Sequence, residues 1–193
     1  MYSGHMSQGL AQTAAALECS ERTLRRYFNE GLLRGERVDG RGEVRISIEE
    51  ERYLRRHWMV LSRLRRALRT EPSVRLAVLF GSMAVGEENS GSDVDLLVDH
   101  ASGDPLDLIR LQRRLQERVG WRVHVVSLED AEESPALLAD VLAEGRVIVN
   151  RGDVWKRLQR RRRGIFRAAA AEAEATREAA GRAIDEARAR LAS

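Results

Sequence analysis

Two short motifs, ten residues apart, carry the residue types that hold phosphate and divalent metal. Gly81 and Ser82 follow an apolar run, and Asp93 and Asp95 lead into the next one. A glycine lets backbone N–H groups approach a phosphate chain, and the hydroxyl and amide of the serine can donate to phosphate oxygens. Because side chains alternate along a strand, the two aspartates are predicted to share one face and to bind Mg²⁺ or Mn²⁺. The pattern predicts a site for a nucleoside triphosphate and phosphoryl-transfer chemistry.

The competing interpretation is a polar loop whose acids are only solvated or cap a helix. Four fixed residues at average usage would occur by chance in such a chain with a probability on the order of one in several hundred. The context adds specificity, because Gly81 follows the strand-like run Val-Leu-Phe and Asp95 leads into Leu-Leu-Val. We therefore prefer the functional interpretation.

The elements that must position these motifs alternate between strand and helix. Apolar runs predict strands over residues 74–80, 94–98 and 121–128, and a closing edge strand over 146–149. Helices are predicted over residues 105–119 and 135–143. Residues 73–150 are thus expected to form a small α/β unit.

At the Gly-Ser and Asp-x-Asp motifs, residues 73–150 resemble the nucleotidyltransferase superfamily related to DNA polymerase beta, and in size its minimal nucleotidyltransferase branch. The resemblance implies an α/β (α+β) fold with a mixed sheet flanked by helices. It also implies metal at Asp93 and Asp95 and triphosphate contacts from Gly81 and Ser82. Many members of that branch are antitoxins paired with an HEPN-type ribonuclease toxin, and some add AMP to it. ATP is therefore the expected nucleotide, and an HEPN-type toxin is the expected protein partner.

The strand over residues 121–128 departs from that family. Members usually supply a third carboxylate there, whereas this chain has His124 between valines. A neutral imidazole can act as a general base but is a poor ligand for hard magnesium. Glu129 and Asp130 are alternatives for the missing acid, although a turn and a helix cap are the simpler interpretation.

Two functions stay open. In the first, Asp93, Asp95 and His124 are catalytic, and the chain transfers NMP from NTP to a hydroxyl on a protein or small molecule. In the second, the domain is catalytically impaired because histidine replaces the third carboxylate, and the chain is a DNA-binding antitoxin or transcriptional regulator. His124 is the feature that discriminates between them.

A basic module is expected before the α/β unit. Helices over residues 10–17 and 21–30, two short strands within 34–46 and a helix from 48 to 69 are predicted. Residues 9–58 resemble the winged helix-turn-helix of mercury-resistance-type (MerR) regulators, which implies DNA binding by the second helix and the wing. The implied contacts are Arg22, Arg25, Arg26, Tyr27, Arg37, Arg41 and Arg45. The alternative is a module for protein contacts.

The charge distribution supports a division into residues 1–70, 71–150 and 151–193. The two ends carry 14 basic and 9 acidic, and 12 basic and 6 acidic side chains, while the middle carries 7 basic and 15 acidic ones. The basic terminal segments could bind a polyanion, and the carboxylates of the acidic middle segment could bind metal ions. From Trp155 the chain is rich in Ala, Arg and Glu, which predicts one long helix that docks, frays or pairs, including as a homodimer.

The composition argues against disulfide-bonded, zinc-binding and membrane proteins. The lone Cys19 allows no internal disulfide, and the scattered histidines have no zinc spacing. No membrane span or signal core is evident, so the protein is expected to be cytoplasmic with no membrane partner. Met1–His5 is interpreted as a cloning remnant.

Overall fold

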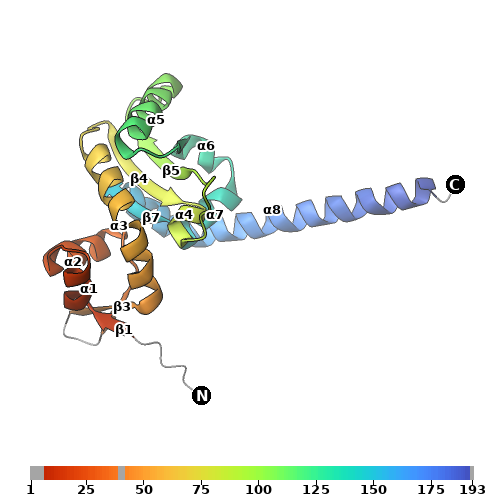
Figure 1. The fold of residues 1–193 in the computed structure, drawn as a ribbon. Helices are drawn as coiled ribbons and strands as arrows, with labels where there is room; N and C mark the ends of the chain where they lie inside the picture. Colours follow the sequence, from red (N-terminus) through yellow and green to blue (C-terminus); the bar gives the residue numbers. More distant parts are fainter. Residues whose placement is uncertain (1–6, 39–41, 192–193) are drawn as a thin grey trace, which may run out of the picture.

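The computed structural model describes residues 7–38 and 42–191. The proposed remnant at Met1–His5 and the predicted DNA contact Arg41 lie outside these residues. Within the described ranges, the strands form two sheets of three and four strands, and helices cover the larger sheet (Figure 1). The mixed sheet, its flanking helices and a long C-terminal helix are as the sequence predicted.

The N-terminal module holds the smaller, antiparallel sheet, in the order β1-β3-β2. Its elements are β1 (Ser7–Gly9), α1 (Leu10–Ala16), α2 (Glu21–Glu30), β2 (Glu36–Val38), β3 (Glu43–Ser47) and α3 (Ile48–Arg69). Both predicted helix caps form, since Ser20 and Ser47 accept hydrogen bonds from the third residue beyond each. Strand β1 was not predicted. It forms by pairing with β3, which lies almost 40 residues later in the chain, so the local sequence pattern does not indicate it. The resemblance to MerR regulators stays a prediction.

The larger sheet has the order β6-β5-β4-β7, with only the β5–β6 pair parallel. Its elements are β4 (Val74–Phe80), α4 (Ser82–Val85), β5 (Val94–His100), α5 (Pro105–Val119), β6 (Val123–Ser127), α6 (Leu128–Glu132), α7 (Pro135–Glu144) and β7 (Arg146–Asn150). Helix α5 has the predicted bounds, and β7 is the predicted edge strand. The short helices α4 and α6 were not predicted as helices.

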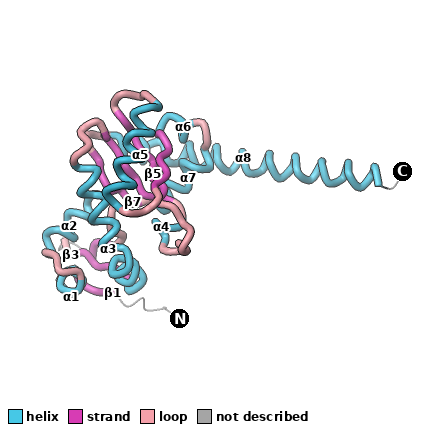
Figure 2. The backbone as a smooth tube through the Cα atoms, turned by 45° about the horizontal axis from the view of Figure 1, so that its top comes forward, coloured by secondary structure: helices cyan, strands magenta, loops and turns pink. Residues whose placement is uncertain are grey.

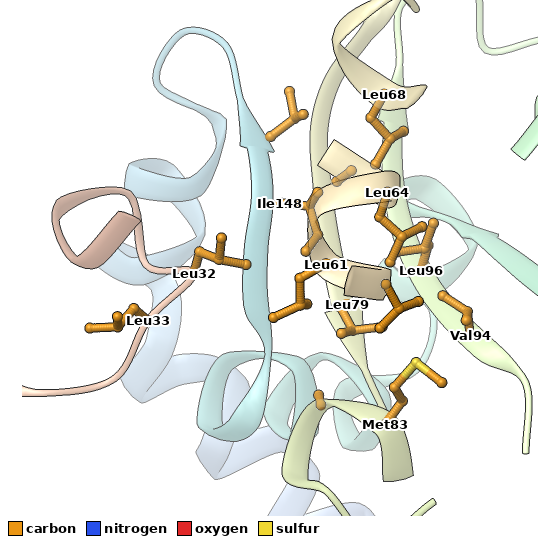
Figure 3. Packing of buried hydrophobic residues seen from close by; sticks show 14 of the residues in the cluster. Leu32, Leu33, Leu61, Leu64, Leu68, Leu79, Met83, Val94, Leu96 and Ile148 are labelled. Carbon is orange, nitrogen blue, oxygen red and sulfur yellow. The ribbon is translucent and has the colours of Figure 1, made fainter. Parts of the chain in front are cut away.

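One hydrophobic cluster runs through the N-terminal module and one face of the larger sheet. It joins Leu32 and Leu33, which follow α2, to Leu61 and Leu64 of α3 and to Ile148 of β7. Figure 3 shows the α3 leucines packed against the sheet and Leu32 beside β7. Helix α3 therefore serves both parts of the chain, since its buried side chains contribute to one continuous core.

The other face of the sheet is covered by α7 and the first part of α8 (Val154–Leu191). Val154, Leu158 and Ile165 pack there against α7, whereas residues 170–184 are exposed. Figures 1 and 2 both show α8 extending away from the body as a single straight helix. Among the described residues, no helix combines the length and apolar character that a membrane crossing needs.

Candidate active site

Three strands of the larger sheet bring the predicted site residues to one edge. Strand β4 ends at this edge, and β5 and β6 begin there. In the antiparallel β4–β5 pair Phe80 is opposite Asp95, and in the parallel β5–β6 pair Asp95 is opposite His124. Residues distant in sequence thus meet because strand register aligns them.

Gly81 occupies a position that another residue would obstruct. Its φ is +70°, in the region that side chains with a Cβ avoid, and it caps the N-terminus of α4. A Cβ placed on it would lie 2.8 Å from Oδ2 of Asp95. The glycine therefore lets the β4–α4 turn lie close to the Asp95 carboxylate, with Ser82 as the first helical residue.

Asp93 lies just before β5 and faces an arginine that the sequence analysis did not single out. Nε of Arg122 is 2.7 Å from Oδ1 of Asp93, although the pair lacks the alignment of a hydrogen bond. The same arginine donates through Nη2 to the carbonyl of Gly91 at 2.7 Å. Its position two residues before His124, directly before β6, was the available signal.

Asp95 and His124 form a contact across the β5–β6 pair. Nδ1 of His124 lies 3.3 Å from Oδ1 of Asp95. Burial raises the pKa of the Asp95 carboxyl, the His124 contact opposes this, and the negative charge of Asp93 adds to the rise. A cation bound at both carboxylates would offset this repulsion between their negative charges.

The donor set fits magnesium bound together with a nucleotide. Oδ1 of Asp93 is buried and has no hydrogen bond, with only the charge of Arg122 2.7 Å away, and Oδ2 of Asp95 lies against the backbone of Gly81. Mg²⁺ commonly takes one or two protein carboxylates and completes its shell with water and substrate phosphates. Across residues 7–38 and 42–191, no group of three or more His, Cys, Asp or Glu side chains is arranged to hold a metal. The carboxylates of Asp93 and Asp95 would therefore need phosphate oxygens beside them.

Glu129 and Asp130 do not lie near the two aspartates. They belong to the first turn of α6, after β6 has crossed to the opposite edge of the sheet, where Ser127 pairs with Val98. The helix cap is Ser127, whose Oγ accepts from the backbone N–H of Asp130, and not the two acids, which were expected to form a turn and a cap. The two acids instead line a cavity of about 690 Å³ at that opposite edge. They are not replacements for the third carboxylate.

The predicted DNA contacts fall into exposed and packed residues. Arg22 and Arg26 are exposed on α2, and Arg25 donates to the carbonyl of Gly42 in the wing at 2.7 Å. Tyr27 differs from the expectation of an exposed residue. Its ring is half-buried, 5.8 Å from that of Trp58, because it packs against the core.

The two predicted wing arginines in the described residues have local partners. Arg37 donates to Oδ1 of Asn29 at 2.6 Å and lies over the ring of Phe28. Arg45 donates to Glu43 at 3.1 Å on the same strand. Both are exposed, so these surface contacts leave their guanidinium groups accessible to solvent.

Comparison with known proteins supports the fold. Residues 62–153 match the family model described as polymerase beta, nucleotidyltransferase. A candidate protein adenylyltransferase of Methanocaldococcus jannaschii, MJ0435, is 42% identical over 55 residues, which are 28% of this chain and 59% of that protein. The chain thus spans less than two thirds of the length of this curated relative.

Several solved structures are similar in fold to this chain. A toxin–antitoxin solved with AMP-PNP has a TM-score of 0.52 at 23% identity, covering 62% of this chain and 97% of that one. A mutant MntA–HpeT toxin–antitoxin has a TM-score of 0.53 at 21% identity, with the same coverage. A tri-AMPylated Shewanella oneidensis HEPN toxin in complex with MNT antitoxin gives 0.50 at 21%, covering 64% and 98%. These similarities show a nucleotidyltransferase fold.

Proposed function

We propose that the chain transfers a nucleoside monophosphate, with AMP preferred, from a nucleoside triphosphate to a hydroxyl on a protein partner. The observation that carries the proposal is the meeting of Gly81, Asp93 and Asp95 at one sheet edge, where the backbone of Gly81 lies directly against the Asp95 carboxylate. Phosphate-binding backbone and paired carboxylates are the two components that such a transfer needs.

Each residue has a defined task in this proposal. The turn at Gly81 and Ser82 would cradle the triphosphate, and Asp93 and Asp95 would hold Mg²⁺ or Mn²⁺, which when bound neutralises charge on the phosphates. A hydrogen bond from Nδ1–H to Asp95 would leave Nε2 of His124 as the basic nitrogen. The hydroxyl oxygen forms the new bond to the α-phosphorus, pyrophosphate leaves with the broken bond, and Nε2 accepts the hydroxyl proton.

The proposed protein partner is an HEPN-type toxin. One similar structure is named as an AMPylated HEPN toxin in complex with its MNT antitoxin, and the curated relative is named as a protein adenylyltransferase. A side-chain hydroxyl of such a toxin would be the acceptor. Modification there would make this chain an antitoxin.

A second candidate keeps the nucleotide site but not the transfer. Two observations favour it: histidine stands opposite Asp95 where a third carboxylate is expected, and Arg122 already supplies positive charge beside Asp93. A site one acid short binds metal less strongly. The chain would then act as a DNA-binding antitoxin or regulator without chemistry.

Labelled-nucleotide transfer by the wild type and two variants distinguishes the two candidates. With the partner as acceptor, His124→Ala is expected to lower the rate of transfer by about 10²-fold or more, because it removes the imidazole that accepts the hydroxyl proton. His124→Asp should raise magnesium-supported transfer. Wild-type transfer that is robust and unchanged in His124→Ala would refute the assigned base.

DNA binding by the N-terminal module is part of this proposal. Arg25 links α2 to the wing, and Arg26 is exposed beside it, so both can neutralise phosphate. Arg25→Ala with Arg26→Ala is expected to weaken the affinity of the full chain for a promoter-like duplex at least tenfold at low salt and to flatten its salt dependence. Electrophoretic mobility shifts across a salt series measure this. Equal affinity and salt slope in the variant would count against DNA as the partner.

A further inference from the structure

Arg146, at the start of β7, is a fully buried arginine whose guanidinium joins three segments of the chain. Its side chain is 2% exposed and makes a bidentate pair with Glu50 of α3, at 2.6 and 2.8 Å. It also donates through Nε to the carbonyl of Ala84 at 2.7 Å and through Nη1 to that of Leu32 at 3.2 Å. One side chain therefore touches α4, α3 and the segment after α2.

The carbonyl of Ala84 belongs to the turn that follows the proposed phosphate-binding residues. Tyr53 of α3 holds the same turn one residue earlier, because its hydroxyl donates to the carbonyl of Met83 at 3.0 Å. The Arg146 guanidinium lies 3.5 Å from the centre of the Tyr53 ring. Burial raises the pKa of Tyr53 to about 12, so its hydroxyl keeps its proton and remains a donor at neutral pH. Two buried donors thus fix consecutive carbonyls of α4.

A third contact from α3 reaches the end of the same loop. Nε2 of His57 lies 3.0 Å from Oε1 of Glu88, and both side chains are buried. The His57 ring stacks on that of Tyr53, with 4.2 Å between centroids. The loop from Ser82 to Glu88 is therefore also held by contacts from the N-terminal half of α3 and from Arg146.

The N-terminal module supplies most of these anchors. Helix α3 begins directly after wing strand β3, and Glu50 in its first turn also accepts from the backbone N–H of Arg34 at 3.0 Å. Gly145, the residue before Arg146, lets β7 begin close to the end of α7, because a Cβ there would lie 2.4 Å from the carbonyl of Val141 and 2.6 Å from Cγ1 of Val78. A lysine in place of Arg146 lacks the planar fork that reaches a carboxylate and two carbonyls together.

We infer that Arg146 and Tyr53 are positioning residues for the nucleotide loop, which makes the N-terminal module a structural part of the nucleotide site. This inference rests on the proposed function for its effect on ATP, but the order of the loop can be measured without nucleotide. The two residues act through the carbonyls of Ala84 and Met83, so they set where the Ser82 amide and hydroxyl point without touching the triphosphate.

Two alterations of the full-length chain test this. Tyr53→Phe removes the hydroxyl and keeps the ring, and it is expected to weaken Mg²⁺-ATP binding about threefold to tenfold in calorimetry, the effect of one lost hydrogen bond. Glu50→Leu with Arg146→Met removes both charges together, which keeps the core filled and should weaken binding at least as much. In the free protein, backbone amides of residues 82–88 should exchange with deuterium faster in both variants.

Arg65→Met is the matched control. Arg65 also ties α3 to the module and to β7, through Glu30 and through the carbonyl of Ile148 at 2.8 Å, but has no contact with the loop among those described. It should leave exchange of residues 82–88 and ATP affinity unchanged. Unaltered loop exchange in Tyr53→Phe and in the Glu50–Arg146 double variant would overturn the inference. A wild type that does not bind ATP would overturn the proposed function, and loop exchange would still decide the positioning role.

Discussion

Magnesium-dependent binding of a nucleoside triphosphate is expected to be lost when Asp93→Asn and Asp95→Asn are combined. The two carboxylates are the proposed protein ligands, and an amide oxygen lacks the charge that draws Mg²⁺ from water. Isothermal titration of ATP with and without Mg²⁺ measures the effect, which should exceed 10²-fold. Transfer to the partner protein should disappear with it.

The double variant is expected to remain folded, which separates a lost ligand set from a lost structure. Because Asp95 has a raised pKa, its charge costs folding free energy once the pH exceeds the ordinary carboxyl range. That cost is absent at lower pH, where the group is protonated in both states. Without metal, the variant should therefore be at least as stable as wild type at neutral pH. ATP affinity that is the same with and without Mg²⁺, or the same in the double variant, would remove the basis for the assigned site.

Among the proposed variants, Arg146→Ala is expected to lower the free energy of unfolding the most. Arg146→Ala leaves Glu50, which is 6% exposed, as a buried charge without its bidentate partner. Breaking a buried pair in this way costs about 3–5 kcal/mol of unfolding free energy. Urea denaturation followed by circular dichroism measures the loss through the shift of the transition midpoint.

The double variant Glu50→Leu with Arg146→Met is the comparison for this measurement. Replacing both charges with apolar side chains of similar size removes the uncompensated carboxylate, so it should be more stable than Arg146→Ala. Arg146→Ala with wild-type stability would show that water reaches Glu50 and that the pair contributes little to folding. Equal losses in the two variants would point to packing rather than charge as the cause.

Much of the central fold could be predicted from the sequence, because its signals are local. The bounds of α5 and the caps at Ser20 and Ser47 follow from helical spacing and from side chains that serve backbone groups three residues away. The Gly81-Ser82 motif follows β4 and Asp93 directly precedes β5, as expected from the apolar runs on either side of the loop. These features depend on short stretches of chain.

The remaining features join residues that are distant in sequence. The contact between Asp95 and His124 depends on the register of β5 and β6, and the placement of Glu129 and Asp130 depends on the length of β6. Arg122 is one of many arginines in the sequence, and only the pairing of β5 with β6 brings it to Asp93. Strand register is decided by packing of whole faces, which a local pattern does not contain.

The sequence by itself determined which residue types could hold phosphate and metal and on which elements they lie. Only the tertiary structure decided what holds those elements in place. Glu50 and Arg146 are 96 positions apart, and each read alone is a charged residue expected at the surface. They are buried together because the N-terminal module packs on the α/β unit, where the guanidinium can satisfy a carboxylate and two carbonyls at once. The physical reason is that a buried charge is stable only with partners, and those partners exist only in the assembled fold.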